Sequence, residues 1–295
     1  MVGRSLVEAL RAMGSEVAGC SRGRTGVPGI PHFAWDVVDQ RVPAAMLQWG
    51  AEYVVHAAAA TDVDHCEAHP EEAERVNVAG TAHVAHVART SGARLVYLST
   101  DSVFDGRRGL YRDDEPPNPI NVYAATKARG EGEAMLCPRA LVVRFNVIGP
   151  ERLTSWILTS ATRGDLIEVF DDVFFNPIET RDLADLIIEL SVTGFEGVCH
   201  LASDEVVSKA DYAERLVAHA GLMGRARLRR VRLADRCRQA PRPLNTSLRV
   251  SSRIEAQFAV PSLDAAIRRL AHGFPGLREP KQAGRAVRLS DGAPE

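Results

Sequence analysis

The chain has 295 residues, of which 25% are charged and 45% hydrophobic, with a formal net charge of −2 at pH 7. This composition is ordinary for a globular protein of one large domain or two unequal ones, and it argues against nucleic-acid binding and a membrane surface. The sequence has no signal peptide, no run of 18 apolar residues and no CxxC pair among its five cysteines. We therefore expect a cytoplasmic protein with reduced thiols and no membrane contact.

The first half of the chain alternates between helical and strand patterns. Apolar residues recur on one helical face over residues 2–13, and short apolar runs at 16–20 and 52–57 predict strands. The other predicted elements of this half are helices at 42–49 and 70–89, strands at 95–99 and 141–144, and a helix that carries Tyr123. This alternation predicts a parallel sheet with helices on both faces.

The pattern loosens after Gly149. The predicted elements of the second half are helices at 156–162, 180–190, 208–220 and 264–270, a strand and turn at 168–175, and a strand at 198–201. Residues 225–232 are strongly basic, but their alternation with Leu228 and Val231 favours a strand with a solvated face over a nucleic-acid site. From residue 274 the Gly, Pro, Arg and Lys content predicts a disordered tail.

The strongest chemical signal lies in the middle of the chain. A predicted strand ends in Ser99 and Thr100, and Tyr123 and Lys127 lie four residues apart, on one face of a predicted helix. A fixed ammonium beside a tyrosine favours the phenolate and should lower the tyrosine pKa from about 10 toward the working pH. With a Ser99 or Thr100 hydroxyl holding a substrate oxygen beside it, such a tyrosine moves protons on or off a carbonyl or alcohol oxygen.

The same Tyr-x-x-x-Lys spacing is also found on solvated helix faces. The Ser-Thr pair and a Pro-rich loop that ends at Asn121, a suitable helix cap, favour the catalytic interpretation. Residues 97–106 (YLSTDSVFDG) and 116–127 (PPNPINVYAATK) resemble the paired motifs of the extended short-chain dehydrogenase/reductase family. They are most similar to its dTDP-4-dehydrorhamnose reductase branch, and weaker similarity runs from residue 2 to about residue 272.

The resemblance implies an α/β fold with a Rossmann-like, doubly wound parallel sheet. The implied divisions are an NAD(P)-binding domain at 1–149, a mainly substrate-binding part at 150–273 from which 176–201 returns to the large domain, and a tail at 274–295. A fold of this type begins with a strand and a glycine-rich turn.

By the same resemblance, Gly3 matches the third glycine of that turn, so the first strand and two glycines are missing from this sequence. Their loss would leave a gap of about 10 Å between the strands at 16–20 and 52–57. We expect an in-frame upstream segment that encodes them, through a misassigned start codon or a shortened chain.

Basic residues follow the strand at 16–20. A basic residue here suits the 2′-phosphate of NADP, whereas NAD-selective sites carry an acid. Ser21, Arg22 and Arg24 therefore favour NADP, with NAD as the alternative cofactor, and a basic surface loop is an equally weighted interpretation.

The resemblance implies further cofactor contacts. Asp36 and Val37 match residues that flank the adenine, and Asn77 matches an asparagine that supports the active site, although it also suits a helix surface. Small residues at 57–60 let the backbone approach a cofactor or let a helix pack tightly on the sheet. The complete expected cofactor set is Gly3, Ser21, Arg22, Arg24, Asp36, Val37, Ala57, Ala58, Ala59, Asn77, Ser99, Tyr123 and Lys127.

Four residues are implied to contact the substrate. Asn146 lies in a segment resembling the one that reaches the nicotinamide end. Arg242 and Asn245 lie in an Arg-Pro-Leu-Asn-Thr-Ser stretch similar to one near the reductases' substrate pocket, with a plain loop as the alternative. Ser102 lies where the reductases usually carry an aromatic residue, so the resemblance does not identify the sugar of the substrate.

The expected function is NADP-dependent reduction of a 4-keto nucleotide-activated deoxysugar. Tyr123 donates the proton, Lys127 lowers the tyrosine pKa and holds the cofactor ribose, and Thr100, with Ser99 as a substitute, bonds the carbonyl oxygen. The alternatives are a sugar-nucleotide epimerase or dehydratase with tightly held NAD, and a non-catalytic regulatory subunit resembling the methionine adenosyltransferase beta subunit. A homodimer is left open. The His-Cys-Glu-Ala-His run at 65–69 lacks the order and second cluster of a zinc site, so no metal is expected.

Overall fold

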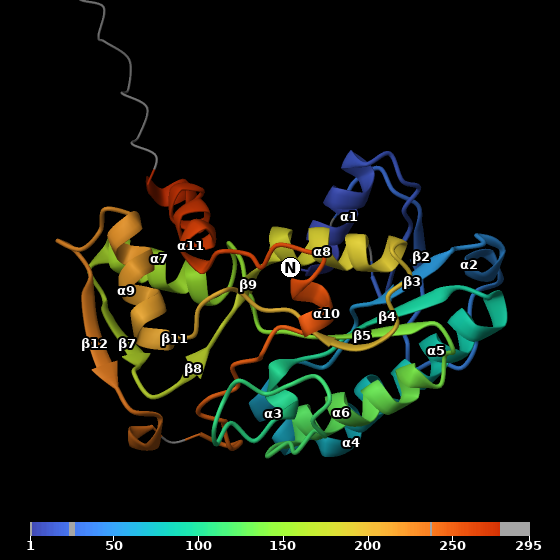
Figure 1. Cartoon of the computed structure of the whole chain (residues 1–295), viewed down its shortest axis with the longest axis horizontal. Coiled ribbons are helices and arrows are strands. Elements are labelled where there is room, and N and C mark those ends of the chain that lie inside the picture. Colours follow the sequence, from blue (N-terminus) through green and yellow to red (C-terminus); the bar gives the residue numbers. More distant parts are fainter. Residues whose placement is uncertain (1, 24–26, 237, 278–295) are drawn as a thin grey trace, which may run out of the picture.

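The computed structural model describes residues 2–23, 27–236 and 238–277 (Figure 1). Arg24 and Cys237 lie outside these residues, as does the predicted tail from residue 278. A larger α/β part holds the first half of the chain, and a smaller part built mostly from later residues lies beside it (Figure 1). Among the described residues, no helix has the length and apolar character needed to cross a membrane.

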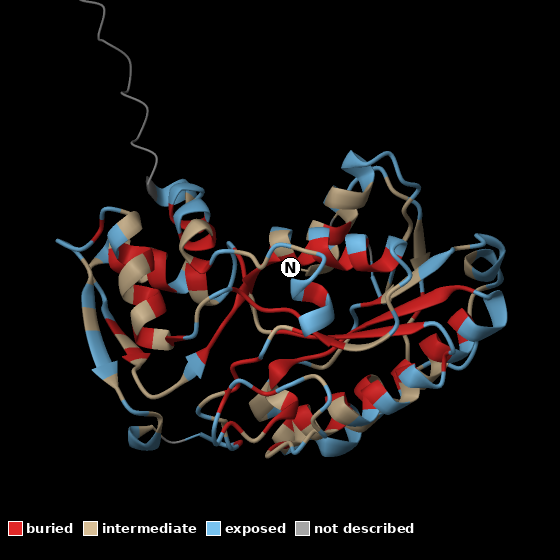
Figure 2. Ribbon diagram, viewed as in Figure 1, coloured by how far each residue is buried: buried red, intermediate tan, exposed pale blue. Residues whose placement is uncertain are grey.

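A parallel sheet of four strands forms the centre of the larger part, in the order β10-β5-β4-β3. The strands are β3 (Tyr53–His56), β4 (Arg94–Leu98), β5 (Ala140–Arg144) and β10 (Gly197–His200). Every residue of β4 and β5 is buried, and Figure 2 shows these strands between two layers of helices. Alternate side chains enter different cores, with Val96 and Leu141 on one face and Leu95 and Val142 on the other.

Helices cover both faces of this sheet, as the sequence predicted. On one face α1 (Val2–Ala12) packs against α8 (Thr180–Val192), and the short α10 (Ser252–Glu255) adds Ile254. The other face is covered by α5 (Gly80–Ser91) and α6 (Val122–Met135), while α2 (Ala44–Gln48) contributes Met46 to its rim. The core of the larger part therefore includes residues from both ends of the chain.

Two further strands of the larger part form their own sheet. β1 (Gly19–Ser21) and β2 (His32–Ala34) pair in parallel. No strand in the described residues pairs with both β1 and β3, which is the separation expected from the sequence. At the start of α1, a Cβ added to Gly3 would lie 3.9 Å from the Cβ of Ala57, so the helix begins beside the end of β3. The upstream segment stays a prediction.

The helix predicted at 70–89 is present, but it is not regular throughout. The chain forms α4 (Pro70–Glu74), a π-helical turn (Arg75–Ala79) and then α5. The irregular turn places Asn77 against Ala60, where Asn77 Oδ1 accepts the Ala60 N–H at 2.8 Å and its Nδ2 donates to the Ala60 carbonyl at 3.1 Å. A tertiary contact thus replaces regular helical bonding, as often happens at π-bulges.

Sequence analysis also missed α3 (Val63–Ala68). Its N-cap is Asp62, whose Oδ1 accepts the N–H of His65 at 3.0 Å. An aspartate followed by a short run of apolar and polar residues is a recognised start signal for a helix.

The smaller part has its own core of apolar side chains. Its helices are α7 (Leu153–Arg163), α9 (Lys209–His219) and α11 (Leu263–His272), and its strands are β7 (Leu166–Phe170), β8 (Phe174–Phe175), β11 (Val207–Ser208) and β12 (Arg227–Val231). β7 pairs in parallel with β12, and β8 pairs antiparallel with β11. The short strands β6 (Val147–Ile148) and β9 (Ile178–Glu179) pair where the chain passes between the two parts.

Two details of the smaller part bear on the sequence predictions. Phe274, which was assigned to a disordered tail, packs against the core of the smaller part, because its ring completes the apolar surface beside α11. Two arginines of β12 are paired with acids on neighbouring elements: Arg229 with Glu168, and Arg230 with Asp211 at 2.7 Å. These ion pairs support a solvated strand face over a nucleic-acid site.

Candidate active site

Tyr123 and Lys127 lie on the first two turns of α6. The helix begins after Asn121, whose Oδ1 accepts the N–H of Ala124 at 2.9 Å, as the sequence predicted. Lys127 is only 3% exposed, and its Nζ donates to the carbonyl oxygen of Leu98 at 2.7 Å. The same nitrogen lies 4.0 Å from the centre of the Tyr97 ring. The helix therefore delivers both side chains to the carboxyl end of β4.

The pKa of Tyr123 moves in the direction opposite to the one predicted. Burial raises the pKa of Tyr123 to about 12, and the neighbouring Thr100 hydroxyl opposes this rise. Burial also lowers the pKa of Lys127 to about 7, against the attraction of Glu131. The physical reason is that the ammonium is directed at the Leu98 carbonyl, so it does not offset the burial of the phenol. Tyr123 consequently keeps its proton at neutral pH.

The two hydroxyls at the end of β4 have different partners. Ser99 Oγ donates to Glu131 Oε1 at 2.5 Å, and Glu131 forms a buried ion pair with Arg144 at 2.7 Å. Because the Ser99 hydroxyl is bonded to Glu131, it is not positioned to replace Thr100 or to contact a cofactor. Thr100 alone lies beside Tyr123, and its oxygen also accepts the N–H of Ser102 at 3.2 Å.

Asp101, which sequence reasoning did not single out, lies at the centre of this site. It is 2% exposed, and burial raises the pKa of its carboxyl. Its Oδ2 accepts from Asn146 Nδ2 at 2.8 Å and from the hydroxyl of Thr246. Its position in the sequence could have identified it. Asp101 directly follows Thr100 at the end of a buried strand, where a carboxylate needs several hydrogen-bond donors.

The residues expected to hold the dinucleotide lie at the ends of β1, β2 and β3. The Arg22 side chain is 79% exposed, with Nε 4.0 Å from Asp36 Oδ2, and Ser21 Oγ lies 3.0 Å from His32 Nε2. Beyond β3, Ala57 and Ala58 are exposed and Ala59 is half-buried. An accessible guanidinium and a backbone without bulky side chains fit a dinucleotide that carries a 2′-phosphate.

Two of the expected cofactor residues have structural partners. A Cβ added to Gly80 would lie 2.8 Å from Val37 Cγ2, so Val37 packs against the start of α5. The amide of Asn77 bridges Ala60 and Thr126, with Nδ2 donating to the Thr126 hydroxyl at 3.0 Å. Asn77 is 1% exposed, which excludes the alternative of a helix surface residue. It ties the turn after β3 to the helix of Tyr123.

The expected substrate residues divide into two groups. Ser102 and Asn146 both donate to Asp101, at 3.3 and 2.8 Å. Arg242 forms an ion pair with Asp64 at 2.9 Å, and its buried Nη1 has no partner among the described residues. Asn245 Oδ1 accepts from Ser247 Oγ at 2.7 Å, so its side chain stabilises a turn. An open cavity of about 580 Å³ is lined by Asp105, Gly106, Arg107, Asp172, Phe174, Arg242, Pro243, Leu244 and Asn245.

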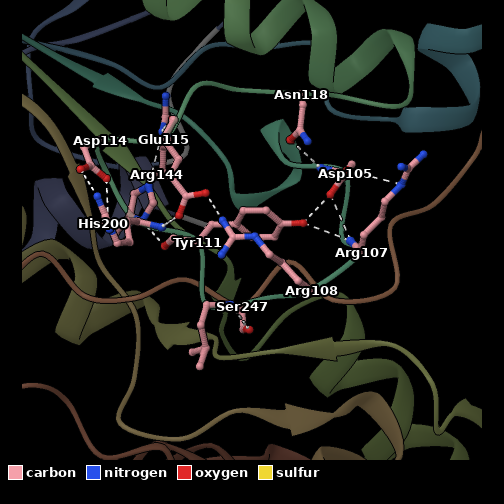
Figure 3. Close-up of polar contacts among 12 residues, drawn as sticks. Asp105, Arg107, Arg108, Tyr111, Asp114, Glu115, Asn118, Arg144, His200 and Ser247 are labelled. Carbon is pink, nitrogen blue, oxygen red and sulfur yellow. Dashed lines mark hydrogen bonds and ion pairs between the residues drawn. The ribbon is translucent and has the colours of Figure 1, made fainter.

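Residues 105–118 form a loop, here called the strap, and Figure 3 shows Ser247 beside it. The strap bonds the 242–247 segment: Leu110 N–H donates to Ser247 Oγ at 2.9 Å, and Asn245 N–H donates to the Gly106 carbonyl at 2.9 Å. The Tyr111 ring stacks on Phe104 with centroids 4.3 Å apart, its hydroxyl accepts the Arg107 N–H at 3.0 Å, and its own N–H donates to the Ser247 carbonyl at 3.1 Å. A second cavity of about 370 Å³ lies along this strap. Neither cavity is lined by Thr100, Tyr123 or Lys127.

Comparison with known proteins gives the family. A family model described as the RmlD substrate binding domain matches residues 1–272. This chain belongs to that family. It is 31% identical over 264 residues to the probable low-salt glycan biosynthesis reductase Agl14 of Haloferax volcanii, covering 85% of this chain and 87% of that protein. It is 32% identical over 234 residues to the dTDP-4-dehydrorhamnose reductase of Mycobacterium tuberculosis, covering 72% and 73%.

Two further similarities bear on the fold and on function. The methionine adenosyltransferase 2 subunit beta of Xenopus laevis is 28% identical over 236 residues, covering 72% of this chain and 67% of that protein. A crystal structure of dTDP-4-dehydrorhamnose reductase from Bacillus anthracis in complex with NADP has a TM-score of 0.80 and 23% identity, covering 92% of this chain and 95% of that chain. The last similarity confirms the predicted Rossmann-like fold.

Proposed function

We propose that this chain is an NADP-dependent oxidoreductase that reduces a 4-keto nucleotide-activated deoxysugar. One observation carries the proposal: Tyr123, Thr100 and Lys127 meet at the end of β4, in a member of the RmlD family. The M. tuberculosis relative is named a dTDP-4-dehydrorhamnose reductase, and the B. anthracis reductase binds NADP. These names support a nucleotide-sugar reductase and the choice of cofactor.

The chemistry of the reduction divides between cofactor and protein. NADPH, when bound, supplies the hydride for the carbonyl carbon. Tyr123 supplies the proton for the carbonyl oxygen, and it is protonated for this role because burial raises its pKa to about 12. Lys127 is fixed by the Leu98 carbonyl and keeps two further N–H donors for the cofactor ribose.

The surrounding residues bind and orient. Arg22, with Ser21 beside it, binds the 2′-phosphate, and the small residues after β3 accept the pyrophosphate side of the cofactor. Arg242, whose side chain is 24% exposed and lines the larger cavity, binds an anionic group of the nucleotide sugar. Asn146 and Ser102 shape the site through their hydrogen bonds to Asp101.

The decisive variant is Tyr123→Phe, which keeps the ring and removes the transferable proton. Turnover should fall by about 10²–10⁴-fold while the dissociation constant for NADPH stays nearly unchanged. Lys127→Ala should weaken NADPH binding, because Lys127 is assigned to the cofactor ribose, and turnover should fall with it. The assay is NADPH oxidation with a panel of 4-keto nucleotide sugars. Full activity of Tyr123→Phe would exclude the proposed proton donor.

A regulatory subunit is the second candidate, because the chain is similar to a methionine adenosyltransferase subunit beta over 236 residues. In that case the unmodified protein turns over no sugar in the panel and raises the activity of a methionine adenosyltransferase. Tyr123→Phe then activates the synthetase as well as the unmodified protein does. Reductase activity that depends on Tyr123 decides in favour of the first candidate.

A further inference from the structure

The carboxylate of Asp101 is surrounded by hydrogen-bond donors. Oδ1 accepts from Thr100 Oγ1 at 3.1 Å and from Ser102 Oγ at 3.3 Å. Oδ2 accepts from Asn146 Nδ2 at 2.8 Å and from the Thr246 hydroxyl. A carboxylate has about four lone-pair sites, two on each oxygen, so these donors fill them all. A protonated carboxyl or an amide at this position would have to turn an N–H or O–H toward one of these donors.

The donors to Asp101 come from three separate segments of the chain. Thr100 and Ser102 flank Asp101 at the end of β4, Asn146 follows β5, and Thr246 lies 145 residues away in the segment held by the strap. Lys209, at the start of α9, attracts the carboxylate from the smaller part, although burial lowers the pKa of Lys209 to about 7. Together these groups compensate the burial of one negative charge.

The hydroxyl of Thr100 has one proton and two lone pairs. Its proton is directed to Asp101, and one lone pair accepts the Ser102 N–H at 3.2 Å. The side of the oxygen that faces Tyr123 is therefore an acceptor. This differs from the expectation from the sequence, in which Thr100 donates to the substrate carbonyl oxygen.

We propose that Asp101 is a positioning residue. Its carboxylate accepts a hydrogen bond from the Thr100 hydroxyl, so that Thr100 presents a lone pair on the side of Tyr123 and the substrate. Thr100 then holds a sugar hydroxyl as an acceptor, and Tyr123 is the single proton donor to the carbonyl oxygen. The kinetic consequence rests on the proposed function, whereas the hydrogen bond itself does not.

The first test needs no substrate. In protein labelled with ¹³C at the aspartate carboxyl carbons, the Asp101 resonance is identified by its loss in Asp101→Asn, or by its shift in Thr246→Val if that variant does not fold. Thr100→Val removes the donor and should raise the pKa of Asp101 by about one pH unit. Thr100→Ser keeps the hydroxyl and should leave it within a few tenths.

The second test is a double-mutant cycle with the active enzyme. Asp101→Asn should lower kcat about tenfold with little change in the dissociation constant for NADPH, and it should have no further effect on kcat in the Thr100→Val background. Independent, multiplying effects would overturn the proposal, as would an Asp101 titration that Thr100→Val leaves unchanged. Absence of turnover in the unmodified protein would refute the proposed function alone, because the titration still decides the role of Asp101.

Discussion

Glu131 and Arg144 form a bidentate ion pair almost wholly withdrawn from solvent, with Nε to Oε1 at 2.9 Å and Nη2 to Oε2 at 2.7 Å. The pair joins α6 to β5. Glu131 also accepts a hydrogen bond from the Ser99 hydroxyl, so the pair fixes the end of β4 from which Thr100 extends. Orientation of the candidate active site therefore depends on a charged pair that takes no part in the chemistry.

Glu131→Gln should destabilise the protein strongly, because it leaves the Arg144 guanidinium buried without its counter-charge. We expect the free energy of unfolding to fall by about 3–5 kcal/mol in urea denaturation. Glu133→Gln, on the same helix at a half-buried position, is the matched control and should change it much less. Equal effects of the two variants would contradict the importance of the pair.

Two glycines of α6 should respond to alanine in opposite ways. A Cβ at Gly130 would lie 2.4 Å from Tyr97 Oη and 2.6 Å from the Asn77 carbonyl oxygen, whereas a Cβ at Gly132 would meet nothing within 4 Å. Gly130→Ala should cost about 1–3 kcal/mol of stability by overpacking. Gly132→Ala should add about 0.5–1 kcal/mol, because alanine favours the helix. Thermal unfolding of both variants measures the difference, and stabilisation by Gly130→Ala would refute the close packing.

Burial of Lys127 should make stability depend on pH. The pKa of Lys127 is lowered to about 7 in the folded protein, against about 10.4 in an unfolded chain, so the unfolded state binds more protons between these values. Stability then rises with pH across this window, by up to about 1.4 kcal/mol per pH unit. The Lys127→Met variant lacks this contribution. Burial of Lys209 gives a similar pH dependence in both proteins, so it cancels when the variant is compared with the unmodified protein.

Urea unfolding at pH 7, 8 and 9 checks this prediction. The unmodified protein should gain stability relative to Lys127→Met at each step upward. A constant difference between the two proteins would show that Lys127 titrates as an ordinary exposed lysine.

Arg22 should set the choice between NADPH and NADH. Its guanidinium is 79% exposed, so the gain from pairing with a 2′-phosphate is modest, about 1 kcal/mol or fivefold in affinity. Arg22→Ala should remove this preference in cofactor titrations and leave NADH binding unchanged. Arg41→Ala, at an exposed position outside the expected site, is the control. An unchanged ratio of dissociation constants in Arg22→Ala would contradict the assignment.

The sequence by itself determined the features that depend on local pattern. The apolar runs of β4 and β5 predicted buried parallel strands, because a strand covered on both faces has no polar side. The four-residue spacing of Tyr123 and Lys127 and the cap at Asn121 predicted where α6 begins and which face carries both side chains. Covalent distance and periodicity fix such properties without knowledge of the rest of the chain.

Only the tertiary structure decided how these side chains are used. The Ser99 hydroxyl donates a hydrogen bond to Glu131, the Lys127 ammonium donates to the Leu98 carbonyl, and the Asp101 carboxylate accepts from Thr246. Each partner is at least 29 residues away in the sequence. Such contacts depend on which strand ends and helices the fold brings together. The same holds for the pKa of Tyr123: its direction follows from burial between elements, which raises it, and the spacing to Lys127 alone predicted the reverse.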